Sequence, residues 1–510
     1  MAGPMRSAPA IVRNATGIGL VALAAGLLAQ FLFVDAAFGI NVPIATAALL
    51  LAGWIVRGPA RPAPRRLDAW LAPGAVILSA FVALRGDGTL VALDVLGAIA
   101  LSGAALASFG GLRVLERPFA AIVALAGRLA LSGVVRGNRP FAALAGVLST
   151  LRGPSRTGRF APVLRGLLIA LPLVLVFVAL FSSADAVFAQ ITRDLFDWDL
   201  DLGSLPGRLA VLAVVAWVTA GLLTFVASGE DCPRTPTESV SAGRPGLGSA
   251  EAVTVLVVLD LLFIGFVVLQ GTYLFGGRDT LDASGLTYAD YARRGFFELM
   301  AVAFLVAGLI LALESFVRTR TRPYVLAAIG LVLLTIVVLA SAFLRLRLYQ
   351  DAYGWTELRF YVLAAIAWLA IGALLAAVTL ARNQTRWLVH GVLVLSFLFG
   401  LAFNVIGPVR FIAEQNMQRA IHPELVAPGG ETGLDVYYLA FLGDDALSVM
   451  AENLCVLPGP VSKQTREALT MWKGWLDRDP AGKAWQAWNL SRERARDTRL
   501  PSVCPMSTTR

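Results

Sequence analysis

The chain has 510 residues, of which 57% are hydrophobic and 15% charged, and its mean hydropathy is +0.72. Soluble domains average about 45–50% apolar and about 25% charged residues, so this composition excludes an ordinary soluble protein. The net charge of +9 comes from arginines in short loops beside apolar stretches. That placement suits anionic lipid headgroups, so we expect the bilayer as partner and no nucleic acid.

About eleven apolar stretches approach the roughly 20 residues that a helix needs to cross the hydrocarbon layer. Their expected ranges are Ala15–Val34, Ile40–Val56, Leu71–Leu84, Leu90–Phe109, Gly166–Phe181, Leu209–Val226, Ala252–Phe275, Phe296–Leu313, Tyr324–Leu344, Phe360–Leu380 and Trp387–Ile406. Their continuous apolar character excludes a membrane β-barrel, whose strands alternate. The chain is therefore predicted to be all-α, a polytopic transmembrane helical bundle with a small helical C-terminal extramembrane region.

The first stretch has a second interpretation, a cleaved signal peptide, because Arg6 and Arg13 precede it and small residues follow near Ala36. Its apolar run is longer than the core of about 7–15 residues usual in such signals. We therefore expect a retained helix.

Arginines fall on every second connection and mark the cytoplasmic side, because arginine resists translocation. With the N-terminus inside, Arg57–Arg66 and Arg113–Arg165 are inner loops, as are the connections that begin at Arg318 and Arg382. The intervening loops hold few arginines. An odd number of spans then puts the C-terminus outside, and the inner arginine loops are expected to contact anionic headgroups.

These features divide the chain into four parts. The ranges are 1–112 with the first membrane helices, 113–165 as a basic cytoplasmic loop, 166–406 with the remaining membrane helices and 407–510 as a helical extracytoplasmic region. Within the loop, Phe119–Val135 carries Arg128 and has Phe119, Val123 and Leu129 on one face. It is predicted to lie in the membrane interface, with a re-entrant helix as the alternative. The following Gly137–Arg159 is predicted to be a linker.

The C-terminal part contains four segments with helical spacing of apolar residues: Val409–Ala420, Leu434–Leu454, Lys463–Leu476 and Ala481–Arg496. Tryptophans recur in the last two at positions 472, 475, 485 and 488. We expect them to form a small helical core, although stacked tryptophans could also bind sugar or lipid headgroups. Cys455 and Cys504 share this external part, which favours a disulfide over two free thiols.

Polar residues inside the membrane are the first functional candidates. Asp260 stands in an otherwise apolar helix, with Gln270 near its outer end. A carboxylate there costs about 2.5–3.5 kcal/mol on insertion scales, so it should face the bundle or a wet cavity. The two interpretations are a proton- or cation-linked site and a buried hydrogen bond between helices. Asp94 and Glu314 lie nearer the interface, where a charge is less costly and less informative.

Two outer loops supply the remaining candidates. The first, Gly276–Arg294, could hold a phosphate or carboxylate through paired arginines, or could simply neutralise its own charges. The second, Arg345–Arg359, could join the first as a charged aromatic mouth. The candidates in and beside these loops are Tyr273, Asp290, Tyr291, Arg293, Arg294, Glu298, Asp351, Tyr353 and Arg359.

Several blocks in this part of the chain carry a family resemblance. They are Arg165–Phe188, Phe263–Gly277, Tyr288–Leu299, Tyr349–Thr356, Leu434–Leu439 and Asp444–Ala446. In this order they resemble a family of uncharacterised bacterial multi-pass membrane proteins, catalogued as a domain of unknown function (the 4153/4173-type domain). The resemblance covers roughly residues 159–454 and implies the cytoplasmic (inner) membrane of a bacterium. The family pattern often has Asn at the position of Asp260, which counts against a proton role there.

Enzyme motifs give no lead. With two histidines, no P-loop, no nucleophile elbow and no dinucleotide fingerprint, we expect no catalytic, metal or cofactor-binding residues, and enzymatic activity stays uncertain. We expect an envelope-associated sensory, regulatory or organising protein. The alternatives are a proton- or cation-linked transporter or lipid-handling protein, and a membrane-embedded transferase.

Overall fold

The structure, a computed structural model, describes residues 15–58, 64–117, 119–151, 205–228, 248–275, 296–317, 319–426, 430 and 432–501. Within these ranges the chain is helical and contains no β-strand, and an isolated antiparallel bridge joins Asp87 and Gly443. The predicted all-α fold class is therefore confirmed.

Eight helices in the described ranges are long and apolar enough to cross a membrane. They are α2 (Ala15–Phe33), α5 (Gly88–Phe109), α10 (Leu205–Ser228), α11 (Ser249–Phe275), α14 (Phe296–Phe316), α15 (Arg322–Tyr353), α16 (Glu357–Ala381) and α17 (Leu388–Ile406). Two shorter apolar helices, α3 (Asn41–Arg57) and α4 (Leu71–Phe81), occupy the second and third predicted positions. The predicted span Gly166–Phe181 lies outside the described residues. The chain is a multi-pass membrane protein.

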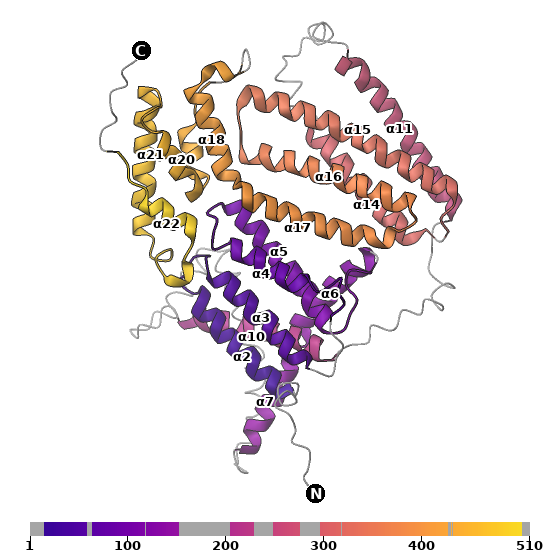
Figure 1. Ribbon diagram of the computed structural model, residues 1–510. Helices are drawn as coiled ribbons and strands as arrows, with labels where there is room; N and C mark the ends of the chain where they lie inside the picture. Colours follow the sequence, from indigo (N-terminus) through magenta and orange to yellow (C-terminus); the bar gives the residue numbers. More distant parts are fainter. Residues whose placement is uncertain are drawn as a thin grey trace, which may run out of the picture.

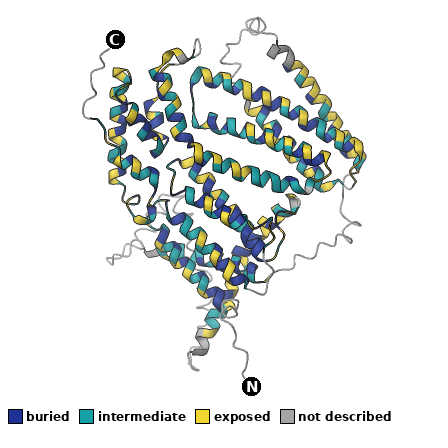
Figure 2. Cartoon of the chain, viewed as in Figure 1, coloured by how far each residue is buried: buried dark blue, intermediate teal, exposed yellow. Residues whose placement is uncertain are grey.

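The membrane helices form two groups, and α17 lies between them (Figure 1). Helices α2 to α5 pack with α10 around the buried side chains of Leu71, Leu106 and Leu223. Helices α11, α14, α15 and α16 pack around Leu256, Leu331 and other apolar residues. On one side α17 contacts α16, and on the other it contacts α4 and α5. Figure 2 shows buried residues inside each group of helices, whereas exposed apolar residues lie along the outer faces.

One end of the bundle carries the arginine-rich connections, and we call it the arginine end. There Arg65 forms an ion pair with Glu116 at 2.7 Å, which joins the loops on either side of α4 and α5. In the second group Arg320 donates to Asn383 Oδ1 at 3.1 Å, which joins the α14–α15 and α16–α17 connections. These contacts place the connections predicted to share one side of the membrane at one end of the bundle.

The opposite end, which we call the tail end, carries the C-terminal region. The backbone N–H of Ile40 donates to Trp488 O at 3.0 Å, and that of Leu490 donates to Ala83 O at 2.9 Å. The α15–α16 turn belongs to the same end, because the N–H of Glu357 donates to the Tyr438 hydroxyl at 2.8 Å. The alternation of loops inferred from arginine positions therefore agrees with the packing.

The segment between α5 and α10 contains two helices where one helix and a linker were predicted. Helix α6 (Phe119–Val135) has its predicted bounds, but Asn138–Leu151 forms helix α7, so the linker prediction is wrong over those residues. Pro140 is tolerated in the first turn of a helix, and Phe141 stacks on Trp217 of α10 at a centroid distance of 6.3 Å. Glycine and arginine content suggested a linker, but the apolar spacing of this segment was the stronger signal.

Helix α6 packs along α10 and does not lie apart from the membrane helices. Gly133 of α6 and Gly221 of α10 approach so closely that a Cβ on Gly221 would lie 2.6 Å from Gly133 O. Leu125 and Leu129 are buried, whereas Phe119 is 44% exposed, so the buried face differs from the predicted one. Both the interfacial and the re-entrant placement of this helix stay predictions.

The C-terminal region consists of α18 (Pro408–Ile421), α19 (Val436–Phe441), α20 (Asp444–Asn453), α21 (Gly459–Arg478) and α22 (Leu490–Asp497), with short 3₁₀ turns Thr385–Trp387, Pro423–Leu425 and Trp485–Ala487 along this part of the chain. The predicted helix Leu434–Leu454 is broken at Gly443, whose φ of 137° requires glycine. The predicted tryptophan core is also wrong. Trp472 packs against the core, but Trp475, Trp485 and Trp488 are 54%, 56% and 41% exposed.

Candidate functional site

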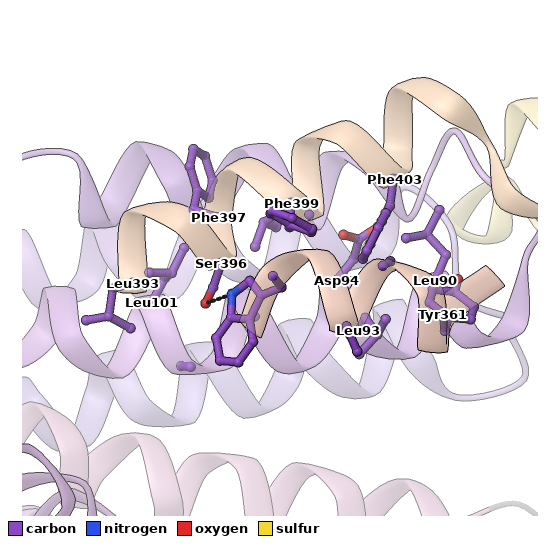
Figure 3. Close-up of a pocket in the computed structure, with 17 residues that line it drawn as sticks. Leu90, Leu93, Asp94, Leu101, Tyr361, Leu393, Ser396, Phe397, Phe399 and Phe403 are labelled. Carbon is purple, nitrogen blue, oxygen red and sulfur yellow. Dashed lines mark hydrogen bonds between the residues drawn. The ribbon is translucent and has the colours of Figure 1, made fainter. Parts of the chain in front are cut away.

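A cavity of about 380 Å³ lies where α4, α5, α16 and α17 meet, between the two helix groups (Figure 3). Its walls are leucine, alanine and phenylalanine side chains, with few polar atoms. The polar side chains that line it are Asp94 on α5, Tyr361 and Trp368 on α16 and Ser396 on α17. The indole N–H of Trp368 donates to the Ser396 hydroxyl at 3.1 Å. An apolar cavity with a few placed polar groups is typical of a small-molecule site.

The cavity is elongated along the helices. Figure 3 shows Leu393 and Leu101 at one end and Phe403, Leu90 and Tyr361 at the other. Leu393 and Phe403 are both on α17, so the cavity extends about 15 Å along a helix that rises about 1.5 Å per residue. A bilayer has about 30 Å of hydrocarbon, and the cavity therefore matches roughly half of that thickness. Its Leu90 end is the end nearest the C-terminal region.

One side of the cavity opens between helices. Leu93 on the cavity wall is 44% exposed, and Ala100 and Ser396 are exposed as well. Leu93 and Ala100 lie within the candidate span α5, and Ser396 lies within the candidate span α17. In a membrane the opening would therefore face lipid acyl chains and not water.

Asp94 is the most unusual side chain in the cavity wall. It is only 2% exposed and accepts a hydrogen bond from Asn404 Nδ2 at 2.8 Å, which joins α5 to α17. Its second oxygen, Oδ2, is buried without a hydrogen-bond partner among the described residues, and so is Asn404 Oδ1. Buried acceptors are normally satisfied, so two unsatisfied acceptors on a hydrogen-bonded pair indicate a missing donor.

A second carboxylate lies at the Leu90 end of the cavity. Asp87 caps α5 by accepting from the N–H of Leu90 at 3.0 Å, and its other oxygen accepts from the Tyr361 hydroxyl at 3.3 Å. Burial raises the pKa of Asp87 to about 6, and the nearby negative charge of Glu357 contributes to the rise. The adjacent Arg85 donates to the backbone carbonyls of Asn404 and Val405. This end of the cavity therefore gathers several carboxylates around one arginine.

The sequence-predicted membrane candidates lie elsewhere. Asp260 is on α11, in the second helix group, where it faces Gly330 of α15. Its Oδ1 is buried without a partner among the described residues, but much of α11 is exposed in the described structure, with Leu261 and Leu262 each 65% exposed. Gln270 on the same helix is buried. Neither Asp260 nor Gln270 lines the cavity at Asp94.

The first predicted loop contributes little to the described structure. Asp290, Tyr291, Arg293 and Arg294 lie outside the described residues. Tyr273 is in the last turn of α11, and Glu298 is exposed in the first turn of α14. Any site built from this loop therefore stays a prediction.

The second predicted loop is a closed structural turn. Arg359 donates to the backbone carbonyls of Tyr353 and Gly354 at 3.0 and 2.7 Å, and its guanidinium lies 4.3 Å from the centre of the Tyr349 ring. From α18, Arg419 donates to Asp351 O at 2.9 Å. These groups hold the α15–α16 turn and attach the C-terminal region to it, which is a different use from the predicted charged mouth.

Sequence reasoning missed the residues that make the cavity. In the sequence, Asp94 lies near a helix end, where a charge is less informative. A signal for the site is present in Asn404, a buried amide in the otherwise apolar helix α17. Intramembrane amides often hydrogen-bond across helices, so Asn404 indicates a polar partner on a neighbouring helix.

The C-terminal region contains one further predicted feature. Cys455 is disulfide-bonded. Cys232 and Cys504 both lie outside the described residues, so the pairing of Cys455 with Cys504 stays a prediction.

Comparison with known proteins identifies a family and nothing closer. No curated protein and no solved structure matches the chain. A family model described as a domain of unknown function (DUF4153) matches residues 72–453, a range that includes every residue lining the cavity. The match confirms the resemblance carried by the sequence blocks described above. The chain therefore belongs to the DUF4153 family.

Proposed function

We propose that this protein is a lipid-handling membrane protein, whose cavity between α5, α16 and α17 binds the apolar chain of a membrane amphiphile. The observation that carries the proposal is the cavity itself, which is apolar, elongated and open sideways between spans. Of the functions considered from the sequence, this one makes use of the feature that the packing creates.

The cavity's dimensions and lining support an acyl or alkyl chain over a water-soluble ligand. Its length of about 15 Å along α17 corresponds to roughly one leaflet of hydrocarbon. The wall offers flexible leucines and aromatic rings, including Phe399 and Phe403. Burying a chain here gains about 0.8 kcal/mol per methylene only if the chain comes from water, so an occupant that comes from lipid must be selected by shape and by the few polar groups.

We further propose that the protein lies in the cytoplasmic membrane of a bacterium with its N-terminus inside and its C-terminus outside. The shared position of the arginine-rich connections supports this orientation, since arginine loops stay on the cytoplasmic side, beside anionic headgroups. The disulfide at Cys455 supports an oxidising compartment for the tail end. In this orientation the cavity lies in the outer half of the membrane.

An envelope sensor or regulator is a second candidate, favoured by the position of the C-terminal region. Asp445 Oδ2 in this region accepts from the N–H of Gly86 at 3.2 Å, directly beside Arg85 and Asp87 at the outer end of the cavity. Occupancy of the cavity could therefore change how the region sits on the α4–α5 turn. The transporter interpretation gains no support from this cavity, because Asp260 does not line it.

Fluorescence quenching tests chain binding directly. A brominated single-chain alcohol should quench Trp368, measured as the difference between the wild-type protein and Trp368→Phe in lipid nanodiscs. Ala365→Phe places a ring in the cavity and should weaken binding about tenfold, which corresponds to about 1.4 kcal/mol. Ala367→Phe is the matched control, because Ala367 is exposed on the same helix and does not line the cavity. Equal quenching in both alanine variants would overturn the proposal.

A further inference from the structure

We infer that Asp94, held in place by Asn404, forms a headgroup subsite in this cavity, and that the amphiphile it selects carries a primary ammonium group. The inference rests on the proposed function, because the ammonium group must be brought to Asp94 by a chain that occupies the cavity. It adds the chemical class of the ligand to that function.

The first reason is the pair of unsatisfied acceptors. Asp94 Oδ2 and Asn404 Oδ1 are buried, carry lone pairs and have no donor among the described residues. The bond from Asn404 Nδ2 to Asp94 Oδ1, at 2.8 Å, keeps the two side chains together. Of the two residues, Asp94 lines the cavity. An ammonium group has N–H donors for Asp94 Oδ2 and also carries the opposite charge, whereas a hydroxyl supplies a donor alone.

The second reason is the charge around the outer end of the cavity. Asp87 lies close to Asp94, and Glu357 lies close to Asp87. Arg85 is the nearby cation, and its guanidinium is already directed at the backbone carbonyls of Asn404 and Val405. The Tyr361 hydroxyl is likewise engaged, because it donates to Asp87. The local balance is therefore negative, which favours a cationic head and disfavours a carboxylate.

The third reason is access. Leu93, next to Asp94 in the sequence, is 44% exposed at the lateral opening. Asp94 lies between the outer end at Leu90 and the inner end at Leu101, so a chain can extend inward from a head held at Asp94. The carboxylate would compensate the ammonium for its lost hydration, which an apolar wall alone would not do.

The test compares three amphiphiles that share one alkyl chain and differ only in the head: amine, alcohol and carboxylate. Competition against the brominated alcohol at Trp368 gives their relative affinities in nanodiscs. The amine should bind the wild-type protein about tenfold more tightly than the alcohol, and the carboxylate more weakly than both. Asp94→Asn should remove the preference for the amine and leave alcohol binding within about twofold. Asp94→Glu should retain part of the preference.

Asp260→Asn is the matched control, because it makes the same change in an intramembrane carboxylate outside the cavity. It should leave the preference for the amine unchanged. Ethylammonium, which lacks the chain, tests the source of the cation and should not compete.

The outcomes separate the two proposals. Equal affinity for all three heads, or a preference for the amine that survives Asp94→Asn, would overturn the headgroup assignment while chain binding stands. If the brominated alcohol does not quench Trp368, the proposed function fails, and the headgroup assignment fails with it. If ethylammonium competes as well as the long-chain amine, the site takes a small cation and the lipid assignment is wrong.

Discussion

The two intramembrane carboxylates lie in different surroundings. Asp94, in the first helix group, is 2% exposed, is hydrogen-bonded to Asn404 and lines a cavity. Asp260, in the second group, is partly exposed on α11 and has the bare Cα of Gly330 for a neighbour. Both leave one oxygen unsatisfied among the described residues. Only Asp94 is hydrogen-bonded to a second side chain, that of Asn404, which also has an unsatisfied oxygen.

The difference shows that position along a helix is a poor guide to the role of a buried charge. Asp260 lies deeper in its helix and is the more costly residue by hydropathy. Asp94 lies closer to a helix end, but the packing of α5 against α17 removes it from water and supplies a polar partner. A site needs a polar partner as well as burial, and here the partner comes from a helix some three hundred residues away in the chain.

The largest expected effect comes from removing the partner of Asp94. Asn404→Leu leaves a buried carboxylate without its hydrogen bond, so the free energy of unfolding should fall by about 3 kcal/mol. Thermal unfolding in nanodiscs measures the change. Gln270→Leu is the comparison in the second group, and it should cost little because Gln270 Nε2 has no hydrogen-bond partner among the described residues. Similar losses in both variants would remove the distinction between the two groups.

The next effect is a pH dependence at the Leu90 end of the cavity. Burial raises the pKa of Asp87 to about 6 from its ordinary value of 3.8. The folded state therefore holds this proton more tightly than the unfolded state. Its contribution to stability is complete below about pH 4 and is lost as the pH rises through about 6. At about 1.4 kcal/mol per pKa unit the total change is on the order of 3 kcal/mol.

Asp87→Asn isolates this contribution, because asparagine can still cap α5 and does not titrate in this range. The difference in melting temperature between wild type and variant should change between about pH 4 and pH 7, with the wild type relatively more stable at the acid end. A difference that stays constant with pH would contradict the assignment. Asp444 also has a raised pKa through burial, which is why the comparison with the variant is needed.

The second group should respond in the opposite direction. Asp260→Leu replaces a partly lipid-exposed carboxylate with an apolar side chain, so the protein should become more stable by about 2 kcal/mol. Thermal unfolding in nanodiscs again provides the measurement. Amphiphile binding at Trp368 should not change. A loss of stability would mean that Asp260 makes a contact beyond the described residues, and the contrast with Asp94 would then weaken.

Most of the helical architecture could be predicted from the sequence, because the length and continuity of apolar runs are set by the bilayer itself. Helices α2, α11 and α17 begin and end within a few residues of the expected bounds. Helix ends differ from the expected bounds where water or tertiary contacts, and not the bilayer, determine where a helix stops. Helix α15 continues past Leu344 to Tyr353, because the chain stays helical after leaving the apolar layer and packs against α18 through Arg419.

The site could not be predicted in the same way. The pairing of Asp94 with Asn404 and the closure of the α15–α16 turn by Arg359 depend on how helices pack. Neither leaves a periodic signal in the chain. The tryptophans of the C-terminal region illustrate the same limit, since their spacing suited a core while Trp475 and Trp485 are more than half exposed. Spacing predicts a face of a helix, but not what covers it.

The smallest expected effect concerns the Tyr361 hydroxyl. Its bond to Asp87 is 3.3 Å long, and Tyr361→Phe should cost about 1 kcal/mol of stability. Because this bond favours the ionised carboxylate and so lowers the pKa of Asp87, the loss should be larger at pH 7 than at pH 4. In the Asp87→Asn background the pH dependence of the loss should disappear. Should the loss be the same at both pH values, the hydroxyl would stabilise the fold by packing alone, and the first group would have one polar contact fewer to distinguish it from the second.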